Sequence, residues 1–291
     1  MTDSTTSKPH ICIIGTGLIG GSLALALKHA DFCGRISGSA RTEATLTKAL
    51  ELGVIDDYST DMDVAVADAD IVVVCVPLGA MRAVFSLIAP ALKPGAIVTD
   101  AGSAKQSVIR DAAETLDEHY KHFVAGHPIA GTERSGVQAA FKELYRQRRV
   151  ILTPTDDTSP DALHRVSSMW RAAGAEVESM SAEHHDMVLA GTSHLPHMLA
   201  FGLVDCLNNL EDVNEIFRFA AGGFRDFTRI ASSDPVMWRD ICLSNREQVM
   251  AMLQRFHNEM MIIKAALASN DGEQLQAVFE RAKKARDQFC G

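Results

Sequence analysis

Short apolar runs alternate with helix-compatible stretches through the first three-fifths of the chain. The runs that fit strands are residues 11–15, 35–39, 71–76, 96–100, 123–126, 150–153 and 175–180. Several are continuous Val and Ile runs, which is typical of a sheet buried on both faces. Between them, residues 22–29, 43–52, 81–92, 105–116 and 161–173 have the composition or spacing of helices. The alternation predicts an α/β fold with a doubly wound parallel sheet.

The pattern changes after residue 180, where β-rich runs become rare and helix formers dominate. Long helices are expected at residues 247–267, which carry several methionines, and at 271–289. The sequence therefore predicts an α/β domain over residues 9–180 and an all-helical domain over residues 181–291. Met250, Met252, Met260 and Met261 are interpreted as core or subunit-interface residues, because methionine fills irregular apolar space. Such apolar helices in a small domain favour a dimer.

Composition and charge exclude several classes of protein. Of the 291 residues, 47% are hydrophobic and 22% are charged, which is ordinary for a soluble globular enzyme. The formal net charge of −9 argues against a nucleic-acid partner, because such binding needs a basic face. The six cysteines form no Cys-x-x-Cys pair, so reduced thiols are expected.

The sequence also bears on localisation. Residues 1–8 are polar and rich in Ser and Thr, so we expect a frayed tail without a signal peptide or a lipidation site. No uninterrupted apolar run reaches the roughly 20 residues that a membrane helix needs. These features predict a cytoplasmic protein with no membrane partner.

A glycine-rich loop follows the first predicted strand and opens the first predicted helix. Its first glycine permits a tight turn, the second lets a pyrophosphate approach, and the third allows the helix to pack closely. The N-terminal amides of that helix can then bind the phosphates. The order strand, loop, helix predicts a Rossmann-type dinucleotide site. The loop consists of Gly15, Thr16, Gly17, Leu18, Ile19 and Gly20.

The end of the second predicted strand bears on which dinucleotide binds. NAD-binding folds usually carry an Asp or Glu there, whereas this chain has Ser39 and Ala40. Arg41 can pair with a 2′-phosphate, while Ser39 and Thr42 can donate hydrogen bonds to it. The sequence therefore favours NADP. The alternative is that Arg41 only stacks on the adenine and that NAD is used as well.

One histidine lies in a stiff, glycine-flanked segment just after a predicted strand, interpreted as a turn. Pro128 restricts the backbone around His127, while Gly126 and Gly131 allow a turn or a close approach to another molecule. An imidazole held in this way, with an ordinary pKa of about 6.5, is suited to proton transfer near neutral pH. The alternative is a structural histidine that only makes hydrogen bonds within the turn.

Three further segments can face a small anionic ligand. Ser103 follows a strand at the edge where ligands bind in open α/β sheets, although its hydroxyl can also cap the helix beginning near Lys105. His194 and His197 are three residues apart, but Pro196 lies between them and no carboxylate stands at ligand spacing, so we expect no metal. The segment 222–229 carries two arginines, which can bind a substrate carboxylate or form a salt-bridge cluster.

Five segments, in this order, resemble the prephenate dehydrogenase family, which includes the arogenate and cyclohexadienyl dehydrogenases of tyrosine biosynthesis. They are Gly-x-Gly-Leu-Ile-Gly-Gly-Ser, Asp-x-Gly-Ser-x-Lys, Gly-His-Pro-Ile-Ala-Gly-Thr-Glu, Ser-His-Leu-Pro-His and Gly-Phe-Arg-Asp-Phe-Thr-Arg-Ile-Ala. The resemblance covers residues 11–238. It implies a dinucleotide-binding domain followed by a helical substrate and dimerisation domain, and a homodimer. One departure is the missing acidic residue near Ser39, which NAD-using members tend to carry.

The resemblance also implies a reaction and roles for residues. The reaction is oxidative decarboxylation of a small anionic cyclohexadienol, with hydride transfer to NADP or NAD and aromatisation of the ring. His127 would take the hydroxyl proton, and Ser103 would hold the same oxygen. The implied substrate-binding residues are Arg229 at a carboxylate, His197 near the side-chain end, and Thr132, Glu133, Asp226 and Trp238 around the pocket.

Two questions about the substrate and class stay open at this point. Prephenate ends in a keto acid and arogenate in an amino acid, and His197 is compatible with both, so we expect prephenate with arogenate or dual use as the alternative. A β-hydroxyacid dehydrogenase would normally use a lysine early in its helical half, and residues 181–263 contain none. A non-catalytic NADP sensor would not need His127, Ser103 and Arg229 together.

Overall fold

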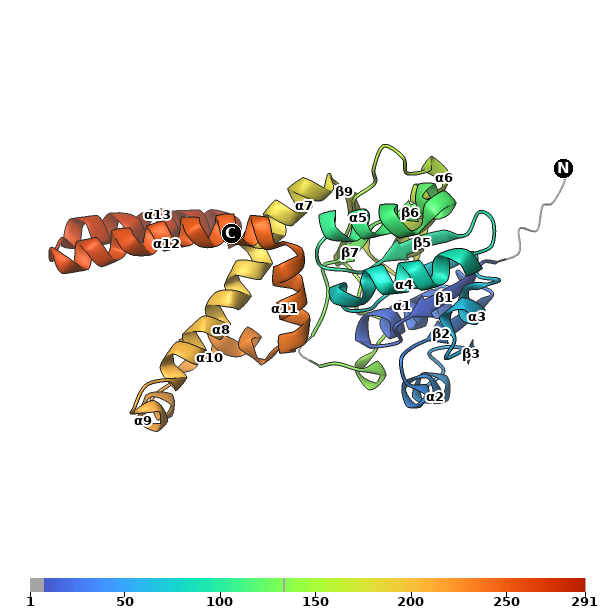
Figure 1. Ribbon diagram of the computed structural model, residues 1–291. Helices are drawn as coiled ribbons and strands as arrows, with labels where there is room; N and C mark the ends of the chain where they lie inside the picture. Colours follow the sequence, from blue (N-terminus) through green and yellow to red (C-terminus); the bar gives the residue numbers. More distant parts are fainter. Residues whose placement is uncertain (1–7, 133, 291) are drawn as a thin grey trace. The chain divides into compact units, whose positions relative to one another are not determined.

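The computed structural model describes residues 8–132 and 134–290 and divides into two compact units (Figure 1). Unit 1 ends at Asn245, and unit 2 begins at Arg246. The tail expected at residues 1–8 lies outside the described residues except for Lys8. The predicted domain boundary at residue 180 falls inside unit 1, so the α/β part and the first helical segments pack as one body.

Six parallel strands form the main sheet, in the order β3-β2-β1-β4-β5-β6, which confirms the predicted doubly wound fold (Figure 1). Chain order reverses between β1 and β4, and ligands bind in the crevice at the carboxyl ends of such neighbours. The strands are β1 (His10–Ile14), β2 (Arg35–Ser39), β3 (Asp57–Tyr58), β4 (Ile71–Val74), β5 (Ile97–Asp100) and β6 (Phe123–Val124). The sequence pattern missed β3, whose two residues are too short to give a hydrophobic run.

Helices cover both faces of this sheet and create two apolar cores. Ile11 and Ile13 of β1 face one core, while Cys12 and Ile14 face the other, because successive side chains of a strand alternate. The first core includes α1 (Leu18–His29), α2 (Glu43–Glu51) and α6 (Pro160–Ala172). The second includes α3 (Met62–Val66), α4 (Met81–Ile88) and α5 (Gln106–Thr115). Short 3-10 helices lie at Leu78–Ala80, Ala89–Ala91, Asp117–His122 and Val137–Ala139.

A second, three-stranded sheet departs from the sequence prediction. It contains β7 (Gly126–Pro128), β8 (Arg149–Leu152) and β9 (Glu176–Ser179), with β7 antiparallel to β8 and β8 parallel to β9. The chain leaves the main sheet at Ala125, whose carbonyl accepts a hydrogen bond of 2.9 Å from the Thr153 amide. The expected turn at His127 is therefore wrong, because this residue lies within β7 and pairs with Ile151.

The helical end of unit 1 begins with a continuous run of 27 residues, Ala182–Asn208. It comprises α7 (Ala182–Leu189), a π-helix (Ala190–His194) and α8 (Leu195–Asn208). By length and composition alone this run qualifies as a membrane-spanning candidate, the single such helix among the described residues. Its first part, however, carries the buried polar residues His185 and Asp186, so it is packed into the protein at that end.

Local sequence explains where the remaining helices begin. Ser181 caps α7 by accepting the His184 amide at 3.2 Å. Asp234 caps α11 (Pro235–Ser244) by accepting the Met237 amide at 2.8 Å. Pro235 occupies a first-turn position that needs no amide hydrogen. The helices that follow α8 in unit 1 are α9 (Val213–Arg218), α10 (Gly222–Thr228), the 3-10 turn Arg229–Ser232 and α11 (Pro235–Ser244).

Unit 2 is a helical hairpin of α12 (Arg246–Ala268) and α13 (Gly272–Cys290), close to the helices expected from the sequence. Several large apolar side chains of the hairpin are exposed. They include Met250, Met260, Met261, Ile262, Leu267 and Phe279. Met250, Met260 and Met261 are exposed and Met252 is half-buried, so the two predicted roles, core or subunit interface, are not decided by this chain alone, and the exposure fits the interface.

Candidate active site

The glycine loop between β1 and α1 is constrained by packing at two positions and open at the third. Gly15 has a φ of +95°, and a Cβ there would lie 2.3 Å from the Cys75 carbonyl oxygen. A Cβ on Gly20 would lie 2.3 Å from the Gly15 carbonyl oxygen. A Cβ on Gly17, by contrast, would meet no atom within 4 Å. The loop is therefore tight against the sheet and open at the start of α1.

The start of α1 has the features of an anion site. Gly17 precedes the helix, no side chain caps it, and its first turn contains no acidic residue. The hydroxyls of Thr16 and Ser39 are buried with no hydrogen-bond partner among the described residues. Free amides at a helix N-terminus favour phosphate, and orphaned hydroxyls nearby can bind the rest of a dinucleotide. These residues fit the predicted dinucleotide.

The other predicted cofactor residues surround this loop. The Ser39 carbonyl accepts the Gly15 amide at 2.8 Å, which ties the end of β2 to the loop. Arg41 is exposed, and Thr42 precedes α2 with its hydroxyl 2.8 Å from that of Thr45. Leu18 and Ile19 belong to the first turn of α1, and their side chains pack in or against the core.

A buried ion pair lies at the carboxyl end of β5. Asp100 and Lys105 are both fully buried, and the Lys105 ammonium donates to the Asp100 carboxylate and, at 2.7 Å, to the Gly126 carbonyl. Asp100 also accepts the amides of Gly102 at 2.7 Å and Gly126 at 3.0 Å. Burial lowers the pKa of Lys105, and the attraction of Asp100 opposes this shift.

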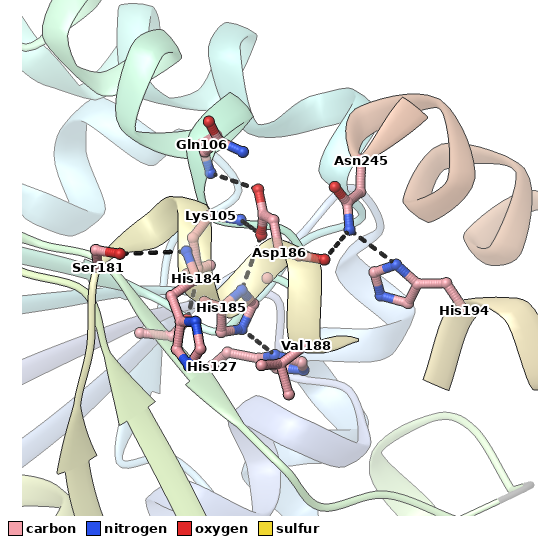
Figure 2. Close-up of polar contacts among 12 residues, drawn as sticks. Lys105, Gln106, His127, Ser181, His184, His185, Asp186, Val188, His194 and Asn245 are labelled. Carbon is pink, nitrogen blue, oxygen red and sulfur yellow. Dashed lines mark hydrogen bonds and ion pairs between the residues drawn. The ribbon is translucent and has the colours of Figure 1, made fainter. Parts of the chain in front are cut away.

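Asp186 of α7, which is distant in the sequence, caps the N-terminus of α5. Its carboxylate accepts the backbone amides of Lys105 at 2.8 Å and Gln106 at 3.0 Å (Figure 2). No side chain within α5 or its N-cap performs this task, so the alternative role of the Ser103 hydroxyl as a helix cap is wrong. Burial alone would raise the pKa of Asp186, but bonds from His185 and these two amides outweigh it and lower the pKa.

His127 lies beside this cap and contacts a second buried histidine. Its Nδ1 is 2.9 Å from Nε2 of His185, and Nδ1 of His185 is 2.8 Å from the Asp186 carboxylate (Figure 2). The side chains of His185 and Asp186 are fully buried, and His127 is 8% exposed. Burial lowers the pKa of His127 well below its ordinary value, and the nearby His185 and Lys105 lower it further. His127 is therefore a neutral imidazole at neutral pH.

His194 is linked to Asp186 through the side chain of Asn245. Asn245 donates to the Asp186 backbone carbonyl at 2.8 Å, and its Nδ2 is 3.1 Å from His194 Nδ1 (Figure 2). Burial lowers the pKa of His194 to about 4, against a smaller opposing contribution from the Ser103 backbone. Ser103 lies in the loop between β5 and α5.

His197 is held by contacts with an indole ring and with the backbone. Its ring stacks on Trp238 of α11, with centroids 3.6 Å apart and planes inclined by 20°, and its Nδ1 is 2.9 Å from the Ser193 carbonyl. Burial lowers the pKa of His197. His194 meets the same indole edge-on at 6.1 Å. Within the part of the chain that the structure describes, no three metal-ligating side chains gather.

The other predicted substrate residues that the structure describes are Arg229, Asp226 and Thr132. Arg229 is exposed and opens the 3-10 turn that packs on α8, while Asp226 is exposed in α10. Thr132 is exposed, and its hydroxyl accepts the Arg134 amide at 3.2 Å. Glu133 lies outside the described residues. The structure thus places His127 against His185 of α7 and stacks His197 on Trp238.

Sequence reasoning missed five polar residues of this site: Asp100, Lys105, His185, Asp186 and Asn245. Asp100 and Lys105 are the first and last residues of the motif Asp-x-Gly-Ser-x-Lys, in which the pattern alone indicates a role only for Ser103. The signal for His185 and Asp186 was a polar pair directly before the apolar run that starts at Met187. Only their packing against the start of α5 distinguishes them from solvent-facing helix residues.

A doubly wound sheet with a glycine loop that fits a dinucleotide, and a buried imidazole in a segment tied to the carboxyl end of β5, is the arrangement expected of a nicotinamide-dependent dehydrogenase. Sequence models of the family, described as "Prephenate dehydrogenase, nucleotide-binding domain" and "Prephenate dehydrogenase, dimerization domain", match residues 23–179 and 181–281. The chain belongs to the prephenate dehydrogenase family, as the resemblance in its motifs indicated.

Individual relatives agree with this assignment along almost the whole chain. The chain is 41% identical to a cyclohexadienyl dehydrogenase of Zymomonas mobilis, covering 95% of this chain and 94% of that protein. It is 38% identical to a prephenate dehydrogenase of Bacillus subtilis, covering 96% and 76% respectively. The crystal structure of prephenate dehydrogenase from A. aeolicus with hydroxyphenyl propionate and NAD+ superposes with a TM-score of 0.91 at 38% identity, covering 98% of this chain and all of that one.

The buried Asp100–Lys105 pair generates a stability prediction. Lys105→Met leaves the Asp100 carboxylate buried without its counter-ion, so we expect the free energy of unfolding to fall by about 3–5 kcal/mol. Urea denaturation followed by circular dichroism measures the change. Lys93→Met is the matched control, because its pair with Asp70 is about one-third exposed and such pairs contribute about 0–1 kcal/mol. Equal losses in the two variants would contradict the prediction.

Proposed function

We propose that this chain catalyses the oxidative decarboxylation of prephenate to 4-hydroxyphenylpyruvate in tyrosine biosynthesis. The observation that carries the proposal is His127, a buried imidazole with a lowered pKa, which follows directly on Gly126, whose amide binds Asp100 at the carboxyl end of β5. The family assignment supports the choice of reaction, and the relatives' printed names support a cyclohexadienol substrate. The alternative substrate is arogenate, alone or together with prephenate, which would give tyrosine directly.

The chain's own residues supply a base and a binding site for the reacting oxygen. The bound nicotinamide supplies the hydride acceptor. His127 draws off the proton of the ring hydroxyl, because a neutral imidazole accepts a proton and its lowered pKa keeps it neutral. Ser103 holds the same oxygen from the loop after β5. Loss of carbon dioxide follows because the ring becomes aromatic.

The helical part of unit 1 supplies the rest of the substrate site in this proposal. Arg229 binds a carboxylate through a charge-assisted hydrogen bond. His197, held flat on Trp238, lies near the side-chain end of the substrate. Thr132, Glu133 and Asp226 would line or close the pocket.

The proposed cofactor is NADP, with NAD as the alternative. Support for NADP comes from the end of β2, where Ser39 replaces the usual acidic residue and Arg41 is exposed without an ion-pair partner among the described residues. Support for NAD comes from the A. aeolicus relative, whose structure contains NAD+.

We also propose a cytoplasmic homodimer that forms through its helical part. The matched "dimerization domain" covers residues 181–281, and the hairpin of unit 2 exposes a series of methionine, isoleucine and phenylalanine side chains. Apolar surface of this kind is stabilised when a second copy covers it. The biosynthetic role of the relatives supports a cytoplasmic location.

A substrate assay tests the proposed function. The protein is incubated with NADP or NAD and with prephenate, arogenate or a β-hydroxyacid, while reduced nicotinamide is followed by absorbance. We expect the largest kcat/KM with prephenate and the release of 4-hydroxyphenylpyruvate. Reduction with a β-hydroxyacid alone, or with none of the three substrates, would refute the proposal.

A variant of Arg41 tests the cofactor assignment. Loss of a charge-assisted bond to a 2′-phosphate costs about 1.5–3 kcal/mol, so Arg41→Ala should lower kcat/KM for NADP by about tenfold or more and leave NAD unaffected. Lys48→Ala is the control, because this exposed lysine of α2 pairs with Glu51 of the same helix. A wild-type preference for NAD over NADP would overturn the assignment.

A variant of His127 tests the catalytic base. A positioned base contributes about 10²–10⁴-fold, so His127→Asn should lower kcat by that range while cofactor affinity, measured by fluorescence titration, is retained. The base is active in its neutral form and its pKa is lowered, so wild-type activity should persist below pH 6.5 and fall only as the pH drops through that lower pKa. The exposed His164→Asn of α6 is the control; an unchanged kcat in His127→Asn refutes the role.

A further inference from the structure

Two buried polar side chains next to His127, those of His185 and Asp186, have no role in the reaction proposed above. His185 and Asp186 are neighbours in α7, both fully buried, and they continue a line of contacts from His127 to the N-terminus of α5 (Figure 2). Buried polar groups of this kind are costly unless they are paired, so their arrangement in one line needs a physical reason.

The proton positions in this line follow from the donors that surround Asp186. Its carboxylate accepts two backbone amides, from Lys105 and Gln106, and its lowered pKa keeps it ionised. An ionised carboxylate only accepts hydrogen bonds, so the bond at 2.8 Å must be donated by His185 Nδ1.

The protonation of His185 in turn determines which nitrogen of His127 carries the proton. Burial lowers the pKa of His185, so its ring is neutral and carries a single N–H, the one given to Asp186. Its Nε2 is then a lone pair and accepts at 2.9 Å from Nδ1 of His127. A neutral His127 that carries its proton on Nδ1 has a free lone pair on Nε2, which is the atom that a proton-abstracting base needs.

The charged groups near the two imidazoles have opposite effects on protonation of the rings. The Lys105 ammonium disfavours a positive charge on either ring, and the buried His194 on the π-helix acts in the same direction on His127. Asp186 and Asp100 favour a positive charge on His185. A proton is therefore held more favourably on His185, against Asp186, than on His127.

We propose that His185 and Asp186 are positioning residues that hold His127 in its Nδ1–H tautomer and take up positive charge after it accepts the substrate proton. The hydroxyl O–H bond breaks as an N–H bond forms at His127 Nε2. The Nδ1–H proton of His127 then moves to Nε2 of His185, which becomes an imidazolium paired with the Asp186 carboxylate. No oxidant or further proton donor is needed. The inference rests on the proposed function for the identity of the proton donor.

Two substitutions of His185 separate the tautomer from the charge uptake. In His185→Gln the amide oxygen accepts from His127 and the amide nitrogen donates to Asp186, but the side chain binds no proton near neutral pH. In His185→Phe a ring of similar shape offers neither bond. We expect kcat to fall by about tenfold in the glutamine variant and by 10²-fold or more in the phenylalanine variant, with KM for the cofactor unchanged, because a base contributes about 10²–10⁴-fold.

The tautomer is measured directly, without turnover, by ¹⁵N NMR of the imidazole rings in the full-length protein. We expect His127 to be protonated on Nδ1 in the wild type and in His185→Gln, and to shift toward Nε2–H in His185→Phe. His184→Gln is the matched control, because this exposed histidine lies one residue away in the same helix. If His185→Phe does not fold, the wild-type and glutamine spectra still decide the tautomer.

The outcomes distinguish the two proposals. If wild-type protein does not oxidise prephenate, the proposed function fails, while the NMR assignment of His127 still tests the tautomer. If prephenate is oxidised but the His185 variants match His184→Gln in kcat, the inference is overturned and the function stands. Equal losses in His185→Gln and His185→Phe with an unchanged His127 spectrum also overturn it, since they would indicate a purely structural histidine.

Discussion

The buried ion pair between Asp100 and Lys105 holds together the segments that form the candidate active site. Asp100 ends β5, and its carboxylate binds the amides of Gly102 and Gly126 as well as the Lys105 ammonium. Lys105 in turn holds the Gly126 carbonyl. The loop that carries Ser103 and the strand that carries His127 are therefore fixed to one pair of charges, neither of which can reach water.

The same lysine links the α/β part to the helices that follow it. The Lys105 backbone amide donates to Asp186 of α7, while the Lys105 side chain pairs with Asp100 at the end of β5. Lys105 therefore connects α7 to the sheet. Asn245, the last residue of unit 1, adds a bond to the Asp186 backbone and one to His194. Catalytic geometry and domain packing consequently depend on the same few buried polar groups, and a change that loosens one should loosen the other.

The sequence was sufficient for the elements that depend on local pattern. Strand β1, the glycine loop and α1 follow from Ile11–Ile14 packing and from glycine chemistry, and the long helices of unit 2 follow from composition. It was insufficient where pairing between distant segments decides the structure. The departure of β7 from the main sheet depends on β8, some twenty residues later, and the role of Asp186 depends on amides about eighty residues earlier.

Some residues of the candidate site could likewise be predicted from the sequence, and others could not. His127 and Ser103 could be identified because each stands in a motif whose order along the chain resembles a known family. The partners that determine their chemistry could not, because a buried His185 has the same local pattern as an exposed His184 beside it. Burial of one and exposure of the other follow from the face of α7 that meets α5, which no single-sequence periodicity specifies over so short a helix.

The π-helix Ala190–His194 has a consequence for how this family can vary. It joins α7, which holds Asp186, to α8, which holds His197 on Trp238. One residue corresponds to about 100° of rotation in an α-helix. Deleting a residue so that this turn became regular helix would swing the whole of α8 around its axis and carry His197 away from the indole. The number of residues in this turn, whatever their identity, thus sets how α8, which carries His197, is rotated about its axis relative to α7, which carries Asp186.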